Sequence, residues 1–283
     1  MIAALAPALH DLLARGEAVV IARISEAMGS TPRETGATML IAAREAIGSI
    51  GGGQLEFHAI DVARAMIATG EERRDLDIPL GPALGQCCGG RVAIALERAG
   101  PHHLAMLGAR DARLEAAAPS ALIFGAGHTG RALASALAPL PAKTLLIDDR
   151  PGLFDDIPPA IRCARLDDPQ TALDEAPTNA AFIILTHSHA LDYRLADAGL
   201  RRGDAAYVGM IGSATKKVRF ARWFAQRGGT REQLARLTCP IGGGLRDKRP
   251  EIIAALTAAD IVRALFSAER ATAQTEVADG RAA

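Results

Sequence analysis

Apolar residues in the first hundred positions fall in short runs that alternate with polar ones, a pattern typical of half-buried strands. Several runs are rich in β-branched side chains, and together they predict strands over 18–24, 38–42, 46–50 and 90–96. Between the third and fourth runs, Leu55, Ala59, Val62 and Met66 recur at helical spacing, which favours a helix over 54–68. These elements, with a further helix over 102–118 that ends before Pro119, predict a small α+β domain.

From Ala121 onward, continuous apolar runs alternate with helical patterns. Runs of this kind are typical of strands in a parallel sheet that is covered on both faces. They predict strands over 121–124, 143–147, 162–165, 180–185 and 205–210, and helices over 130–137, 191–200, 214–226 and 249–266. The predicted fold class is therefore α/β, with a smaller α+β domain (1–118), a C-terminal Rossmann-like domain (119–268) and a flexible tail (269–283).

Glycines spaced as in a dinucleotide-binding turn follow the first strand of the second domain. Gly125 permits the tight turn, Gly127 lets the backbone approach a pyrophosphate, and Gly130 lets the helix pack close to the strand. Asp148 lies 18 positions beyond Gly130, where an acid can accept hydrogen bonds from a ribose diol and repel a 2′-phosphate, although Arg150 weakens that exclusion. A phosphate-free turn kept only for packing remains the alternative interpretation.

Residues that follow the other strands of this domain are expected to meet at the same edge of the sheet. His187 and His189 point apart in extended backbone, so they could share a metal only in a kinked loop. The alternative is a loop before a helix that is capped by Ser188 or Asp192. A dehydrogenase of this fold needs an acid or base beside the nicotinamide. No Tyr-x-x-x-Lys pair is present, so His128, His187 and His189 are the only candidates for that role.

Three polar clusters in the first domain are candidate ligand contacts. Gly29–Arg33 is a turn with hydroxyls and a fixed cation, and Gly51–Gly53 places consecutive amides at a helix start, so both could hold an anion. The third cluster contains the adjacent thiols of Cys87 and Cys88, flanked by glycines and close to Arg91. Such thiols could bind a soft metal or carry sulfur as a persulfide, whereas two small apolar residues at a strand start are the alternative.

The overall charge narrows the class of partners. Lys plus Arg equal Asp plus Glu at 32 each, which gives no indication of nucleic-acid binding.

The first fifteen residues predict an amphipathic helix and not a signal peptide, and no apolar run approaches the length of a membrane span. The four cysteines are too few for a disulfide framework, so we expect a cytoplasmic protein with reduced thiols.

Seven motifs together resemble the XdhC/CoxI family of xanthine dehydrogenase accessory proteins. The resemblance extends from about residue 18 to residue 266. The motifs begin at Gly29 (GSTPR), Gly48 (GSIGGGQLE), Gln86 (QCCGGR), Phe124 (FGAGHTGR), Asp148 (DDR), Thr186 (THSHALD) and Gly209 (GMIGSATKK). The chain departs from the family at Cys239–Arg246, where many relatives have Gly-Leu-Asp-Ile-Gly-Ala.

The resemblance implies a molybdenum cofactor chaperone that has no turnover of its own. Such a protein holds the molybdopterin form of the cofactor as cargo, supports its sulfuration with a cysteine desulfurase, and inserts it into xanthine dehydrogenase. The QCCGGR variant is similar to the branch that serves xanthine dehydrogenase specifically. Molybdenum cofactor biosynthesis proteins are further implied partners, and a homodimer is left open.

The expected cofactor-binding residues combine the clusters of both domains. They are Gly51, Gly52, Gly53, Gln86, Cys87, Cys88, Gly125, Gly127, His128, Gly130, Asp148 and His187. Of these, Cys87 and Cys88 are also the expected contacts of the molybdenum. The main alternative is an NAD(P)-dependent oxidoreductase with His187 as acid or base, and a third is a transferase-like or sensing protein for a dinucleotide form of the cofactor.

Overall fold

The structure, a computed structural model, describes residues 4–81, 89–243 and 246–267. It divides into two compact units, Ile2–Ala117 and a second that begins at Ala118. The sequence-based predictions for Gln86, Cys87, Cys88 and the tail 269–283 lie outside the described residues.

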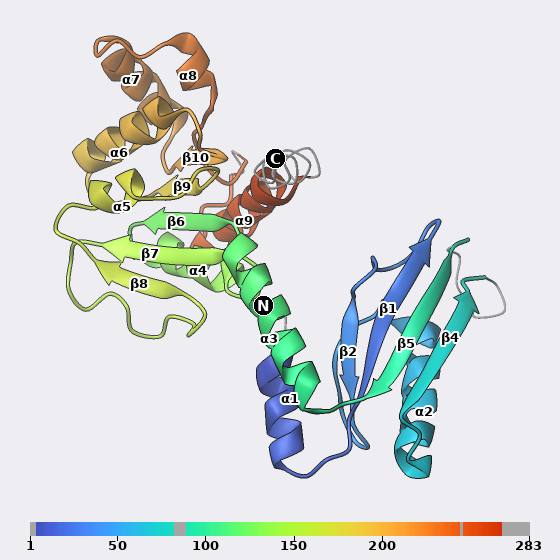
Figure 1. The fold of residues 1–283 in the computed structure, drawn as a ribbon. Coiled ribbons are helices and arrows are strands. Elements are labelled where there is room, and N and C mark those ends of the chain that lie inside the picture. Colours follow the sequence, from blue (N-terminus) through green and yellow to red (C-terminus); the bar gives the residue numbers. More distant parts are fainter. Residues whose placement is uncertain (1–3, 82–88, 244–245, 268–283) are drawn as a thin grey trace, which may run out of the picture. The chain divides into compact units, whose positions relative to one another are not determined.

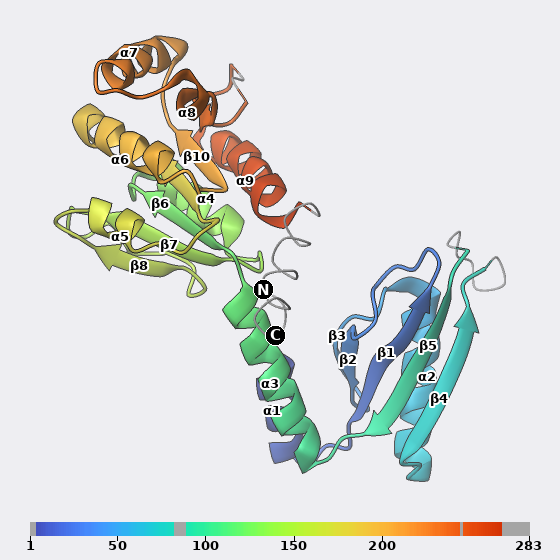
Figure 2. The same ribbon diagram turned by 45° about the horizontal axis from the view of Figure 1, so that its top comes forward.

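An antiparallel sheet forms the centre of the first unit, with strand order β3-β2-β1-β5-β4 (Figure 1; β3 is labelled in Figure 2). The elements of this unit are α1 (Leu5–Ala14), β1 (Val20–Met28), β2 (Thr38–Ile41), β3 (Ala46–Gly48), α2 (Gly53–Thr69), β4 (Arg73–Pro79), β5 (Arg91–Arg98) and α3 (Pro101–Ala117). Alternate residues of β1 divide between two cores, because successive side chains of a strand point to opposite faces of the sheet.

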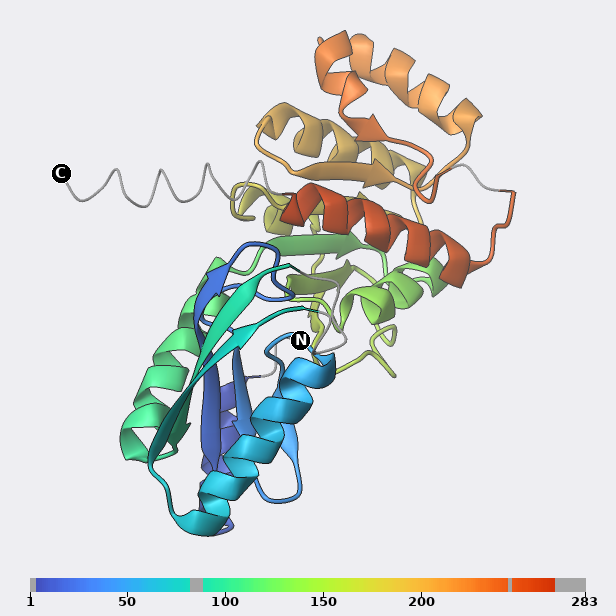
Figure 3. The same ribbon diagram turned by 90° about the vertical axis from the view of Figure 1, so that its right-hand side faces the viewer.

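Helix α2 covers one face of the antiparallel sheet (Figure 3). It buries Leu55, Ala59, Ala63 and Met66, which lie on one side of the helix, against Val20, Ala22 and Ile24 of β1 and neighbouring strands. On the other face, Leu5, Leu9 and Leu12 of α1 pack with Leu107 of α3 and Ile21 of β1. This unit therefore has two hydrophobic cores, one on each side of a single sheet.

A parallel sheet forms the centre of the second unit, with strand order β11-β10-β9-β6-β7-β8; all of these strands except β11 are labelled in Figure 1. Its elements are β6 (Ser120–Phe124), α4 (His128–Leu137), β7 (Lys143–Asp148), β8 (Arg162–Arg165), α5 (Gln170–Asp174), β9 (Ala181–Ile184), α6 (His189–Arg202), β10 (Tyr207–Met210), α7 (Ala214–Ala225), α8 (Arg231–Ala235), β11 (Leu237–Thr238) and α9 (Pro250–Phe266). Counted along the chain from β6, this order is that of the doubly wound Rossmann fold. The predicted fold class is confirmed.

Helices cover both faces of the parallel sheet. Residues of α5, α6 and α7 bury one face, with Leu195, Phe220 and Phe224 at its centre. Residues of α4 and α9 bury the other face, including Leu133 and Ile261. The central strands β6 and β9 are buried on both sides, which explains why they appear in the sequence as continuous apolar runs, whereas the edge strand β8 is mostly exposed.

Several predicted boundaries differ from the observed elements. Helix α4 begins at His128, two residues before the predicted start, so that His128 is part of its first turn. The elements β4, β11, α5 and α8 were not predicted from the sequence pattern. Among the described residues, no helix combines the length and the apolar character that crossing a bilayer requires.

Candidate functional site

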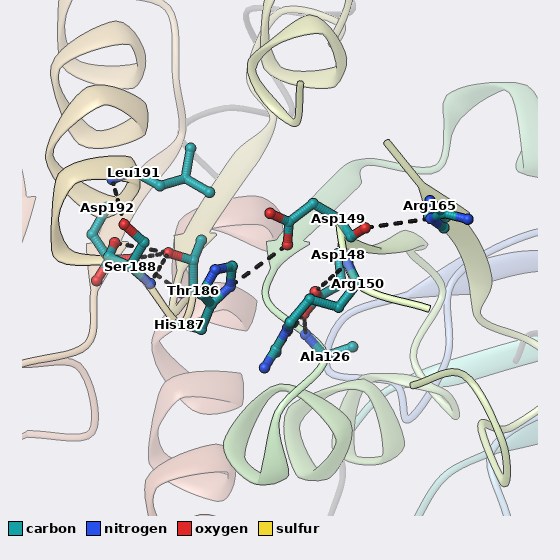
Figure 4. Close-up of polar contacts among 10 residues, drawn as sticks. All are labelled: Ala126, Asp148, Asp149, Arg150, Arg165, Thr186, His187, Ser188, Leu191 and Asp192. Atoms are coloured by element: carbon teal, nitrogen blue, oxygen red, sulfur yellow. Dashed lines mark hydrogen bonds and ion pairs between the residues drawn. The ribbon is translucent and has the colours of Figure 1, made fainter. Parts of the chain in front are cut away.

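The candidate site of the second unit lies at the carboxyl edge of its parallel sheet. Strand β6 is flanked by β7 on one side and β9 on the other, so the chain reverses its direction of sheet growth here. In open α/β sheets, ligands bind outside the carboxyl ends of the strands at such a switch point. The segments that follow the three strands, at Ala126, Asp149 and Thr186, come together at this edge (Figure 4).

The three glycines of the turn after β6 differ in whether the fold excludes a side chain at their positions. Gly125 has φ +119°, and a Cβ there would lie 2.2 Å from the Leu185 carbonyl oxygen. A Cβ on Gly130 would lie 1.8 Å from the Gly125 carbonyl oxygen, so the packing of α4 on β6 excludes any side chain. Gly127 has an ordinary φ of −70°, and a Cβ there would meet no atom within 4 Å. Packing therefore explains Gly125 and Gly130, but it does not explain Gly127.

The carboxylate of Asp148 is buried and holds the glycine turn. It accepts hydrogen bonds from the Ala126 amide (2.7 Å), the Arg150 amide (3.0 Å) and the Arg150 guanidinium (2.9 and 3.0 Å). Burial raises the pKa of this carboxyl, but the hydrogen bonds from the Arg150 side chain and the two amides outweigh that effect, so its pKa lies well below the ordinary value. Asp148 is thus a charged link between the ends of β6 and β7.

Asp149, the next residue, faces His187 across the carboxyl end of β6 (Figure 4). The Asp149 Oδ1 to His187 Nδ1 distance is 3.5 Å, and the side chains are 33% and 41% exposed. One ligand atom each of Asp148, Asp149 and His187 lies within 4.8 Å of the others, a grouping that could hold a metal ion. A cation there would compete with the Arg150 guanidinium for the carboxylate of Asp148.

The loop that carries His187 is anchored at its base by a buried ion pair. Thr186 donates from its amide (2.9 Å) and its hydroxyl (2.8 Å) to Asp192 Oδ1 in α6. The other Asp192 oxygen accepts from Lys216 Nζ of α7, which also donates to the Ile211 carbonyl oxygen (2.9 Å). The side chains of Asp192 and Lys216 are only 2% and 10% exposed. The loops after β9 and β10 are therefore fixed to each other.

The cap of α6 follows one of the alternatives from the sequence. Ser188 is the N-cap residue, and its hydroxyl accepts from the Leu191 amide. Asp192 does not cap the helix, because its carboxylate binds Thr186 and Lys216. His128 and His189 are the exposed first residues of α4 and α6.

In the first unit, the predicted amide cradle at Gly51–Gly53 contains an acid from the protein itself. Oε1 of Glu56 accepts from the Ser49 hydroxyl (2.6 Å) and from the amides of Ile50 (2.9 Å), Gly51 (3.2 Å) and Gly52 (2.8 Å). Burial raises the pKa of Glu56, but the hydrogen bonds from Ser49 and the amides outweigh it, and the pKa is lowered overall. The cradle therefore binds a carboxylate of its own helix.

Close approaches join this cradle to the other described clusters of the first unit. A Cβ on Gly51 would lie 2.6 Å from Pro32 Cγ, and a Cβ on Gly90 would lie 2.4 Å from the Ser30 carbonyl oxygen. The turn Gly29–Arg33 thus contacts both the cradle and the start of β5. Gln86, Cys87 and Cys88 precede this start but lie outside the described residues.

Three functional candidates were missed in the sequence: Glu56, Asp192 as an anchor, and Lys216. Asp149 is among the residues after β7 that were expected at this edge. The partners of Asp192 and Lys216 come from other elements, so the local sequence gives no signal for them. For Glu56 the local sequence does carry a signal, because an acid in the first turn of a predicted helix is expected to bind the free amides of that turn.

The two cysteines of the second unit differ in exposure. Cys239 is buried, and burial raises the pKa of its thiol, whereas Cys163 is exposed.

The strand order and the glycine turn define the second unit as a Rossmann-type domain, the class that binds phosphate-bearing ligands at this edge. A model described as the XdhC Rossmann domain matches residues 121–261, and one described as the XdhC and CoxI family matches residues 12–77. The chain belongs to the XdhC and CoxI family, as the motifs predicted.

Two known proteins are similar over most of the chain. YqeB of Escherichia coli K12, described as uncharacterized, is 26% identical over 257 residues, which are 86% of this chain but 43% of YqeB. A crystal structure described as a xanthine dehydrogenase from Bacillus halodurans has a TM-score of 0.75 and 19% identity, covering 94% of this chain and 97% of that one. At that identity the second similarity shows a shared fold.

Proposed function

We propose that this protein is a molybdenum cofactor chaperone that protects the cofactor, supports its sulfuration with a cysteine desulfurase, and inserts it into xanthine dehydrogenase. Membership of the XdhC and CoxI family supports an accessory role toward xanthine dehydrogenase. The description of the Bacillus halodurans relative also names that enzyme. The proposal requires a site for a phosphate-bearing pterin, together with ligands for a soft metal.

Gly127 is the observation that carries the phosphate part of the proposal. The first amides of α4 have no acceptor within the helix, and the helix N-terminus attracts an anion. A Cβ at Gly127, the residue that precedes these amides, would meet no atom within 4 Å, so a side chain there would not disturb the fold. Its absence leaves the amides accessible, which suits the terminal phosphate of molybdopterin better than it suits a turn kept for packing.

The first unit carries candidate contacts of its own. The Gly51–Gly53 amides can hold an anionic group of the cofactor only if that group replaces the carboxylate of Glu56. Cys87 and Cys88 follow from the sequence as the contacts of the metal, because thiolates are preferred ligands of soft metal centres. When bound, the cofactor supplies the metal and its sulfido ligand, and the residues of this chain hold it.

Substitution of Gly127 tests the proposal without damage to the fold. Wild type, Gly127→Ala and Gly127→Val are expressed in a strain that makes the cofactor, and the molybdopterin content of each purified protein is measured. We expect a stepwise, severalfold loss from wild type to Val. Gly108→Ala in α3 is the matched control, because it also adds a Cβ where no atom lies within 4 Å. Unchanged content in Gly127→Val would contradict the phosphate site.

The same proteins distinguish the oxidoreductase alternative. Titration with reduced nicotinamide dinucleotide, followed by fluorescence, would favour that alternative if binding were micromolar and a small carbonyl were turned over. For the metal contact, Cys87→Ala and Cys88→Ala are compared in cofactor content and in sulfido loading of xanthine dehydrogenase. Normal values in both variants would remove the cysteines from the proposal.

A further inference from the structure

The two neighbouring acids at the end of β7 differ in their free hydrogen-bonding capacity. A carboxylate offers about four acceptor positions, and Asp148 uses them for four donors from Ala126 and Arg150. Its side chain is only 2% exposed. Asp148 therefore has no position left for a ligand unless the link to the glycine turn is broken.

Asp149 keeps its acceptors available. Its backbone carbonyl oxygen accepts from Arg165 Nε (3.3 Å), which fixes the turn, while its carboxylate stays one-third exposed. The 3.5 Å separation from His187 Nδ1 is longer than a normal hydrogen bond, so both side chains retain hydrogen-bonding capacity. They line one narrow surface cleft together with Gly125, Asp148, Pro169 and Leu191.

His187 is held in place by the buried anchor beneath it. Thr186 is fixed to Asp192 through both its amide and its hydroxyl, and Asp192 is paired with Lys216. In the sheet, β6 lies between β7 and β9, so Asp149 and His187 stand on opposite sides of the glycine turn. A ligand whose phosphate binds at the start of α4 would extend toward this pair.

We propose that Asp149 and His187 contact the ligand beyond its phosphate, whereas Asp148 serves only to hold the glycine turn. This inference rests on the proposed phosphate site at α4. A carboxylate and an imidazole side by side recognise neighbouring N–H or O–H donors. The ligand class is thus a phosphate ester with adjacent hydrogen-bond donors, whether the amino edge of a pterin or the diol of a ribose.

Calorimetric titration of the full-length protein tests this assignment. The probes are inorganic pyrophosphate, 6-hydroxymethylpterin diphosphate, ADP and 2′,3′-dideoxy-ADP. Asp149→Ala is expected to weaken the probe that carries the recognised donors about tenfold, as one charged hydrogen bond is lost, and to leave pyrophosphate within about twofold. If Asp149→Ala loses affinity for the pterin probe, the recognised donors are those of the pterin amino edge. If it loses affinity for ADP but not for dideoxy-ADP, they are those of the ribose diol.

Matched variants separate this contact from general effects. Asp167→Ala removes the same charge from an acid that is 97% exposed after β8, and it should weaken no probe selectively. Asp148→Asn should lower the melting temperature without changing the ratio of affinities among the probes. His187→Gln should reproduce the selective loss of Asp149→Ala in weaker form, since the amide keeps a donor and an acceptor.

Two results would overturn the inference. One is a selective loss in Asp148→Asn with none in Asp149→Ala, and the other is an Asp149→Ala protein that behaves like Asp167→Ala with every probe. Failure of the underlying phosphate site gives a different pattern: pyrophosphate would not bind wild type, or it would bind Gly127→Val equally well. In that case the inference falls together with the site.

Discussion

Replacement of Glu56 is the sharpest test of the amide cradle in the first unit. One carboxylate oxygen of Glu56 accepts from the Ser49 hydroxyl and from the amides of Ile50, Gly51 and Gly52. The left-handed φ values of Gly51 (+135°) and Gly52 (+78°) point these amides at a common centre. Removal of the carboxylate takes away the acceptor that these four donors share and leaves the Gly51 amide with only the Ser49 hydroxyl oxygen (3.2 Å).

The magnitude follows from the number of donors and from their partial exposure. A hydrogen bond to a charged group contributes about 1.5–3 kcal/mol when it is well formed. Here four donors share one oxygen, and Gly51 and Gly52 are only half-buried, so water can replace part of the interaction. We expect Glu56→Ala to lower the free energy of unfolding by about 2 kcal/mol, and Glu56→Gln, which keeps a neutral oxygen acceptor, by about half of that.

The sign of the pH dependence is fixed by the lowered pKa of Glu56. A carboxyl with a lower pKa in the folded state stabilises the protein above its unfolded pKa, and this contribution is lost as the pH falls through the folded pKa. The difference in unfolding free energy between wild type and Glu56→Gln should therefore be full at neutral pH and shrink under acid conditions.

Hydrogen exchange followed by mass spectrometry resolves this effect within the chain. Peptides that contain the Ile50–Gly52 amides should exchange faster in Glu56→Ala, while peptides of the second unit act as an internal reference. Asp61→Ala is the matched control, because Asp61 is an exposed acid on the same helix. Unchanged exchange at Ile50–Gly52 together with an unchanged urea midpoint would refute the conclusion that Glu56 holds the cradle.

Three further predictions concern the second unit. Lys216→Met should lower the free energy of unfolding by about 3–5 kcal/mol, because it leaves the buried Asp192 unpaired; urea unfolding followed by Trp223 fluorescence measures this, and a cost below 1 kcal/mol would be too small for a buried pair. Gly130→Ala should lower the melting temperature strongly while Gly127→Ala should not, and equal effects would contradict the assigned packing. In iodoacetamide labelling mapped by mass spectrometry, Cys163 should react well before Cys239, because Cys239 is buried; faster labelling of Cys239 would show that its loop opens.

Where the sequence predicted the fold well, the pattern was set by local contacts. The continuous apolar runs identified β7, β9 and β10, because both faces of these strands contribute to the cores, whereas β8 is an edge strand that is mostly exposed. Strand β4 was missed because four of its seven residues are charged, and only Leu76 and Ile78 alternate inward. Helices α5 and α8 have five residues each, and β11 has two, so none is long enough to show a period.

The sequence located the residues of the site but not their partners. Spacing from the glycines identified Asp148, yet its saturation by Ala126 and Arg150 depends on how β6 and β7 lie side by side. In the same way, Gly51–Gly53 were recognised as an amide cradle, whereas its occupant depends on the first turn of α2. A motif defines which donors and acceptors are available, and only the packing decides which of them remain free for a ligand.

The two glycine turns of this chain show how that distinction bears on function. Both precede a helix, but the amides at Gly51 and Gly52 donate to Glu56 of their own helix, whereas the first turn of α4 contains no acid and a Cβ at Gly127 would meet no atom within 4 Å. An anion that binds at Gly51–Gly53 must displace a charged carboxylate from four donors, and one that binds at the start of α4 has no carboxylate of that helix to displace. Anion binding should therefore begin at Gly127. An anion should bind at Gly51–Gly53 only if other contacts of the same ligand offset the displacement of Glu56.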